Sequence, residues 1–212
     1  MLEVRSVANS RTETVRACFE RLFERHGIPG AIRSDNGAPF ASTNAVLGLT
    51  RLSAWWVVLG IDLERGRRAC PQDNGAHERL HLDLSREIEA SRLGAYQAEL
   101  DEWRRVFNEE RPHEALGMQR PAEVYQRSER KYEGTPEDME YSGMERRRVQ
   151  HGGFIRWQGQ WLFISSALKG WSVGLEPSGA DYWNVWFGQL LLGQLENSTL
   201  SFQPTQTQIQ SL

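Results

Sequence analysis

Two stretches decide the fold of this chain, Ile32-Arg33-Ser34-Asp35-Asn36-Gly37-Ala38-Pro39-Phe40 and Pro71-Gln72-Asp73-Asn74-Gly75-Ala76-His77-Glu78. Each predicts a carboxylate at the end of a secondary-structure element. In the first, the apolar pair Ala31-Ile32 predicts a short strand, and Asn36-Gly37 predicts a turn because both residues tolerate a positive φ. Asp35 is therefore expected at the carboxyl end of that strand.

The second stretch predicts the start of a helix. Asn74 is a favourable N-cap, and apolar residues follow with helical spacing at Leu80, Leu84 and Ile88. Glu78 then lies in the first turn of the helix. Because an acid at that place is also favoured by the helix N-terminus alone, Glu78 by itself does not define a site.

Two exposed carboxylates at element ends suit a metal-dependent reaction on phosphate. Mg²⁺ and Mn²⁺ prefer oxygen ligands and keep open positions for phosphate and water. Two such ions, roughly 3.5–4 Å apart, activate a nucleophile and stabilise the leaving oxygen of an in-line displacement. A two-carboxylate hydrolase acting on sugars would also use Asp35 and Glu78, but it would leave the surrounding motifs unexplained.

Several further motifs occur in a fixed order along the chain. They are His26-Gly27-Ile28-Pro29, Arg33-Ser34-Asp35-Asn36-Gly37, Pro39-Phe40-Ala41-Ser42, Leu52-Ser53-Ala54-Trp55-Trp56, Leu59-Gly60-Ile61, Pro71-Gln72-Asp73-Asn74-Gly75-Ala76-His77-Glu78-Arg79 and Asn108-Glu109-Glu110-Arg111-Pro112-His113-Glu114-Ala115-Leu116-Gly117. With these motifs the chain resembles the integrase-core transposases of bacterial insertion sequences. These are relatives of retroviral integrases, with an Asp, Asp, Glu catalytic triad on a ribonuclease H-like fold.

The resemblance implies catalytic and metal-binding roles for Asp35, as the second acid of the triad, and Glu78, as the third. It also implies two Mg²⁺ or Mn²⁺ ions, cleavage and strand transfer of double-stranded DNA at element ends and target, and a homo-oligomer on DNA. No acid before Asp35 fits the first position of the triad. The chain is therefore expected to lack its first catalytic strand and to be inactive alone. The alternative is a non-catalytic, DNA-binding remnant of a decayed transposase.

Polar and basic residues near the two acids are candidate DNA contacts. These are Asn36, Arg67, Arg68, Asn74, His77, Arg79, His81 and Arg86. A solvated helix face or surface loop would have the same composition. His77 and His81 have the spacing of zinc ligands but no evident third ligand. Asp73 also precedes an Asn-Gly pair, but its position just before the N-cap fits local hydrogen bonding.

Bulk properties are compatible with a DNA-processing protein. All but two of the 25 basic residues are arginine, which suits bidentate phosphate contacts, although a coding bias would give the same excess. The net charge of −3 argues mildly against a nucleic-acid partner. Two cysteines without a pairing or metal pattern favour a reducing compartment, and the sequence has no apolar run of about 18 residues and no signal peptide. The resemblance then implies a cytoplasmic, nucleoid-associated bacterial protein without a membrane partner.

The fold class expected is α/β: a ribonuclease H-like integrase core, truncated at its N-terminus, followed by a small C-terminal β-barrel. The core is expected at residues 1–127, a charged linker at 128–145, the barrel at 146–202 and a disordered tail at 203–212. Five barrel tryptophans are expected mostly in the core, with a base-stacking platform as the alternative. They are Trp157, Trp161, Trp171, Trp183 and Trp186.

Overall fold

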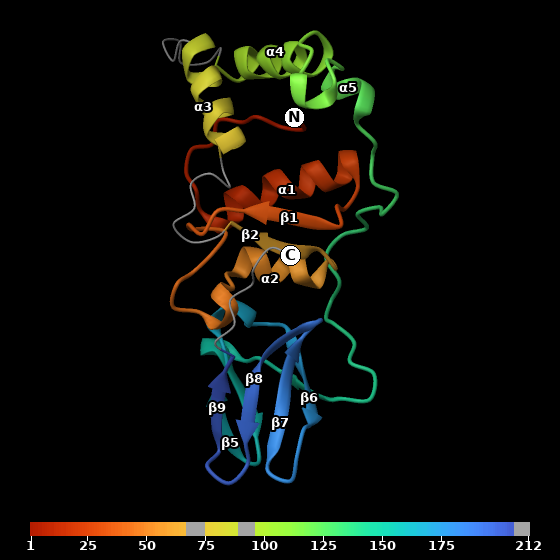
Figure 1. The fold of residues 1–212 in the computed structure, drawn as a ribbon. Helices are drawn as coiled ribbons and strands as arrows, with labels where there is room; N and C mark the ends of the chain where they lie inside the picture. Colours follow the sequence, from red (N-terminus) through yellow and green to blue (C-terminus); the bar gives the residue numbers. More distant parts are fainter. Residues whose placement is uncertain (67–74, 89–95, 206–212) are drawn as a thin grey trace. The chain divides into compact units, whose positions relative to one another are not determined.

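The computed structural model describes residues 1–66, 75–88 and 96–205, which form a mixed α/β structure (Figure 1). The chain divides into two compact units. The first, here called the helical unit, consists of Met1–Ile28 and Ala69–Tyr132. The second, the sheet unit, consists of Pro29–Arg68 and Glu133–Leu212. The expected α/β class is thereby confirmed.

The helical unit is built from four α-helices and a 3-10 turn in its described residues. They are α1 (Thr12–His26), α3 (Gly75–Glu87), α4 (Tyr96–Glu109), η3 (Glu114–Leu116) and α5 (Pro121–Val124). Tyr96, Leu100, Trp103 and Phe107 have the apolar spacing of a helix, and they lie in α4. Pro121 begins α5, where proline is favoured. Helix α1 ends at Gly27, where φ is 78° and an added Cβ would lie 2.6 Å from the carbonyl oxygen of Ser128. Only glycine fits such a position.

A polar clamp joins α3 to the segment after α4. The Glu87 carboxylate accepts a hydrogen bond from Trp103 Nε1 at 2.9 Å and another from Arg111 Nη1 at 2.9 Å. The Arg111 guanidinium also lies over the Trp103 ring, 5.5 Å from its centroid. Hydrogen bonding from Arg111 holds the pKa of Glu87 below its usual value. Trp103 also belongs to a small buried core with Ile88 and Leu100.

The first half of the sheet unit is a parallel β-α-β arrangement. Strand β1 (Ala31–Ser34) pairs in parallel with β2 (Asp62–Arg65), in a register that places Ser34 opposite Arg65. Helix α2 (Arg51–Val58) lies between them in the chain and begins with a capping box formed by Thr50 and Ser53. Leu52, Trp55 and Trp56 have the spacing of an apolar helix face, and all three are buried.

The second half of the sheet unit consists of antiparallel strands. Strands β3 (Glu145–Arg148), β6 (Ser172–Pro177), β7 (Tyr182–Phe187), β8 (Leu190–Glu196) and β9 (Ser201–Pro204) form one sheet in the order β3-β6-β7-β8-β9. Strands β4 (Phe154–Trp157) and β5 (Gln160–Phe163) pair only with each other. Short 3-10 turns complete the unit at η1 (Val46–Gly48), η4 (His151–Gly153) and η5 (Ser166–Leu168).

The expected C-terminal β-barrel is corrected by this topology. Within residues 133–205 the strands form an open five-stranded sheet and a separate hairpin rather than a closed barrel. Both layers pack their inward side chains onto one core, which includes Ile155, Leu162, Val173 and Phe187. Burial is therefore achieved by packing two layers face to face, without a continuous hydrogen-bonded ladder. Gln203 and Pro204, expected in a disordered tail, lie in β9, and residues 206–212 lie outside the described residues.

The end of the predicted linker packs onto the five-stranded sheet. Asp138 accepts hydrogen bonds from Ser172 N at 2.8 Å and from Ser172 Oγ at 2.6 Å. The Tyr141 hydroxyl donates to the Ser172 carbonyl at 2.8 Å, and burial raises the pKa of Tyr141 to about 12. Burial alone would raise the pKa of Asp138, but the hydrogen bonds from Ser172 and Met139 and the charge of Arg148 hold it below its usual value.

Asp138→Asn is expected to lower the free energy of unfolding at neutral pH by about 2 kcal/mol, because hydrogen bonds to a charged acceptor are lost. Because the pKa of Asp138 is lowered in the folded state, its charged form stabilises the fold above the ordinary pKa of 3.8. This stabilisation is lost as the pH falls through the folded-state pKa. The gap between wild type and variant should thus shrink below about pH 4. Urea unfolding from pH 7 to pH 2.5 measures this, with exposed Glu137→Gln as the matched control; a gap independent of pH would contradict it.

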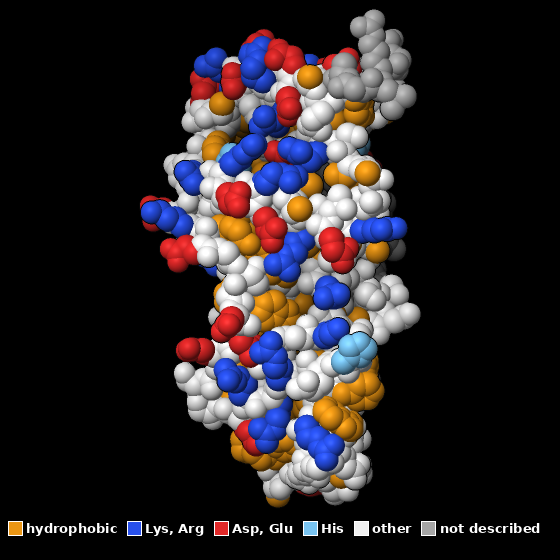
Figure 2. Space-filling view, turned by 180° about the vertical axis from the view of Figure 1, so that it is seen from behind, with side chains coloured by type: hydrophobic (Ala, Val, Ile, Leu, Met, Phe, Trp, Pro, Cys, Tyr) orange, Lys and Arg blue, Asp and Glu red, His pale blue; other side chains and the backbone are white. Residues whose placement is uncertain are grey.

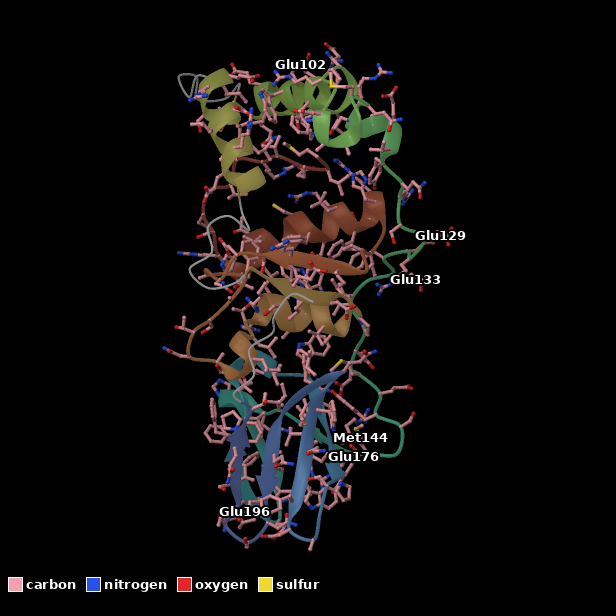
Figure 3. The ribbon with its side chains drawn as sticks, in the orientation of Figure 1. Glu102, Glu129, Glu133, Met144, Glu176 and Glu196 are labelled. Atoms are coloured by element: carbon pink, nitrogen blue, oxygen red, sulfur yellow. The ribbon has the colours of Figure 1, made fainter. Side chains whose placement is uncertain are left out.

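The domain boundaries stay a prediction, and limited proteolysis tests them. Glu129 and Glu133 lie on the exposed connecting segment, whereas Glu176 and Glu196 lie in strands of the sheet (Figure 3). A protease that cuts after glutamate is therefore expected to cleave at Glu129 or Glu133 before Glu176 or Glu196, leaving a fragment that retains Asp138 and Tyr141. Earlier cleavage at Glu176 or Glu196 would contradict the division.

Candidate active-site carboxylates

Asp35 lies immediately after β1, at the carboxyl end of the strand, as predicted. Its side chain is exposed, and Oδ1 accepts a hydrogen bond from Gly37 N at 3.1 Å. The turn does not use the positive φ expected of Asn36 and Gly37. The Asp35 side chain closes the turn instead, by bonding to the backbone two residues on, and this orients the carboxylate.

Asn36 ties the ends of the two parallel strands together. Its Nδ2 donates to the carbonyl oxygen of Gly66 at 3.0 Å, just beyond the end of β2. The candidate DNA contact Asn36 thus has a structural role within the sheet unit. A contact between Asn36 and DNA stays a prediction.

Arg65 is the residue that sequence reasoning missed. It is the last residue of β2, lies opposite Ser34 and is only 6% exposed. Its Nη2 donates to the carbonyl oxygens of Phe40 at 3.3 Å and Gly48 at 3.2 Å. Burial lowers the pKa of Arg65, and the nearby Asp35 carboxylate opposes that shift. The guanidinium therefore anchors the loop that follows Asp35.

Glu78 lies in the first turn of α3, as predicted, and its side chain is exposed. Three of the predicted DNA contacts, Arg79, His81 and Arg86, are also exposed on α3. A residue that contacts phosphate must be exposed, but the residues of a solvated helix face are exposed too. Exposure therefore does not distinguish the two interpretations. Outside the described residues lie three further predicted DNA contacts, Arg67, Arg68 and Asn74, the side chain of His77, and Asp73.

The two carboxylates belong to different units, Asp35 to the sheet unit and Glu78 to the helical unit. Their approach to metal-bridging distance stays a prediction. Both are exposed oxygen donors, and neither forms an ion pair with any of the residues that the structure describes. Their chemistry fits a hard divalent cation. In the described ranges, no group of three or more His, Cys, Asp or Glu side chains gathers as a metal site would.

Residues 59–121 match a family model described as Integrase core domain. The match contains Glu78 and the motif that begins at Asn108, whereas Asp35 precedes it. The resemblance to an integrase-core transposase is thereby confirmed over this range. No helix in residues 1–66, 75–88 and 96–205 has the length and apolar character needed to cross a membrane.

Arg65→Ala is expected to lower the free energy of unfolding of the chain by about 2–3 kcal/mol, because two carbonyl groups lose a buried donor and the space is left unfilled. The matched control is Arg51→Ala, an exposed arginine of the same unit, with an expected change within about 0.5 kcal/mol. Urea denaturation measures both. Equal effects of the two substitutions would show that Arg65 does not anchor the loop after Asp35.

Proposed function

We propose that this chain carries part of the catalytic core of an insertion-sequence transposase that, in the full-length protein, cleaves DNA and transfers strands. The observation that carries the proposal is the integrase core match at residues 59–121, with Glu78 exposed in the first turn of α3. Asp35 supports it from outside the match, as an exposed carboxylate at the end of a parallel strand. Ligands of open α/β sheets bind beyond that end of the strands.

In this proposal Asp35 and Glu78 hold Mg²⁺ or Mn²⁺. When bound, a pair of such ions supplies charge neutralisation and an activated nucleophile for in-line displacement at phosphorus. The Gly37 N–H orients the Asp35 carboxylate, and Arg65 fixes the loop behind it. Both acids lie at element ends, which a ribonuclease H-like arrangement of the core would bring to one site.

The proposed DNA contacts extend from the two acids along α3. Arg79 and Arg86 present guanidinium groups suited to bidentate phosphate contacts, and His81 lies on the same helix. Arg67, Arg68 and Asn74, which lie between β2 and α3 in the sequence, complete the proposed set together with His77 and Asn36. DNA binding through arginines should weaken as salt rises. Assembly of several copies on nucleoid DNA is part of the same proposal.

The test is loss of Mn²⁺ binding and of DNA cleavage in the same variants. Asp35→Asn and Glu78→Gln should each weaken Mn²⁺ binding, followed by electron paramagnetic resonance, because each removes a charged ligand. In the full-length protein each should lower cleavage of element-end DNA by about 100-fold or more. The control for Asp35 is Asp62→Asn, at the exposed start of β2, and the control for Glu78 is Glu99→Gln, in the first turn of α4. Both controls should behave as wild type.

Two outcomes would overturn this proposal. Mn²⁺ binding that survives the double substitution Asp35→Asn, Glu78→Gln would place the metal elsewhere. DNA binding without metal-dependent cleavage by the full-length protein would assign the alternative role, a DNA-binding protein without catalysis.

A further inference from the structure

The hairpin of β4 and β5 exposes an apolar face. Along both strands, side chains alternate between the core and the outside, with Ile155, Trp157 and Leu162 buried. On the outside are Phe154, Arg156, Trp161 and Phe163, here called the hairpin face. Trp161 is 53% exposed, Phe163 52% and Phe154 37%. A cluster of large exposed apolar side chains marks a binding surface more often than an isolated one does.

The hairpin face is held in a fixed geometry. Phe154 lies opposite Phe163 across the ladder, with their ring centroids 5.4 Å apart at 68°. Arg156 lies opposite Trp161, with its guanidinium carbon 5.3 Å from the ring centroid. Such cross-strand pairs stabilise one arrangement of the side chains. The face is therefore built before any ligand arrives, which lowers the entropic cost of binding.

The turn of the hairpin is fixed as well. Gln158 and Gly159 both have a positive φ, of 44° and 81°, as a tight two-residue hairpin turn requires. Asn197 Oδ1 accepts hydrogen bonds from Gln158 Nε2 at 3.1 Å and from Trp157 Nε1 at 3.0 Å. The inward side of the hairpin is thus tied to the end of β8, and its outward side chains are displayed on a rigid support.

The sequence around the hairpin face is basic. Residues 146–175 contain no Asp or Glu, although the whole chain has a net charge of −3. The cations in this stretch are Arg146, Arg147, Arg148, Arg156 and Lys169. Arg147 pairs with Glu145 and Arg148 with Asp138, so Arg146, Arg156 and Lys169 remain outside the ion pairs of the described residues. Figure 2 shows Lys and Arg side chains beside apolar ones over the antiparallel strands of the sheet unit, with some Asp and Glu side chains among them.

We propose that the hairpin face binds unpaired bases of single-stranded nucleic acid. Exposed aromatic rings beside cations are the recurring platform for single strands, since each base offers a flat face to a ring and each phosphate a charge to an arginine. Stacking requires a base outside a duplex, so the proposal specifies single strands. A second copy of this chain is the poorer fit, because two faces of this kind would bring like charges together. The site involves neither Asp35 nor Glu78 and so goes beyond the proposed function.

The experiment measures fluorescence anisotropy of a labelled oligothymidine titrated with the intact chain. Trp161→Ala and Phe163→Ala should each weaken binding about tenfold, the effect of removing one stacked ring. The matched control is Tyr182→Ala, an exposed aromatic on β7 that lies opposite Glu196 in a stretch with acids. It should change affinity less than about twofold, and Trp161→Phe should retain most of the binding. Circular dichroism checks that each variant is folded.

Two further ligands separate stacking from charge. An abasic strand of equal length should bind the wild-type chain about as weakly as Trp161→Ala binds oligothymidine, and a blunt duplex should show no loss with Trp161→Ala. Equal affinities of wild type, Trp161→Ala and Phe163→Ala for oligothymidine would overturn the proposal. So would a dimer in sedimentation that dissociates in Trp161→Ala while oligothymidine binding is unchanged. The Mn²⁺ titration of the Asp35 and Glu78 variants is independent of these measurements. A failure of one proposal therefore leaves the other untouched.

Discussion

The parallel pairing of β1 with β2 is the constraint from which the rest of the Asp35 site follows. Two parallel strands need a crossover between them, here the chain from Asp35 to Ile61, and their carboxyl ends then lie at one edge. Asp35 comes directly after β1 and Gly66 directly after β2, so both lie at that edge. The bond from Asn36 to Gly66 and the bonds from Arg65 to Phe40 and Gly48 hold the start of the crossover against it.

The sheet unit buries side chains from two distant parts of the sequence in one core. Ala54 and Val58 of α2 belong to the same apolar cluster as Val173 and Phe187 of the antiparallel sheet. Trp55 Nε1 donates to Thr135 Oγ1 at 2.9 Å. This bond ties α2 to the start of the second segment of the sheet unit, which begins at Glu133. Segments far apart in the sequence thus bury each other. Burial of apolar surface drives this packing, and it does not require the buried segments to be close in the sequence.

Local patterns predicted the elements well because helices and strands depend on near neighbours in the sequence. The apolar spacing in α2 and α4, the proline at the start of α5 and the strand that precedes Asp35 are all readable from such patterns. Whether the C-terminal strands close into a barrel could not be predicted from such patterns, because closure depends on hydrogen bonds between strands distant in the chain. Arg65 was missed for the same reason: a charged residue at a strand end is ordinarily exposed, and only the loop from Phe40 to Gly48 buries it.

The alternation of side chains along the hairpin does not tell which of its two tryptophans is buried. Both faces of the hairpin carry aromatic residues, so alternation predicts that Trp157 and Trp161 point to opposite sides without saying which side is the core. Ile155 and Leu162 decide it, since both join the buried cluster and take Trp157 with them.

Net charge alone does not decide whether the proposed hairpin face can bind nucleic acid. Exposed charges are screened over about 8 Å at physiological salt, so a ligand on the hairpin face would respond to nearby charges rather than to the sum over the chain. A chain of net charge −3 can therefore present a surface suited to phosphate wherever its acids are absent from the local sequence, as they are from residues 146–175.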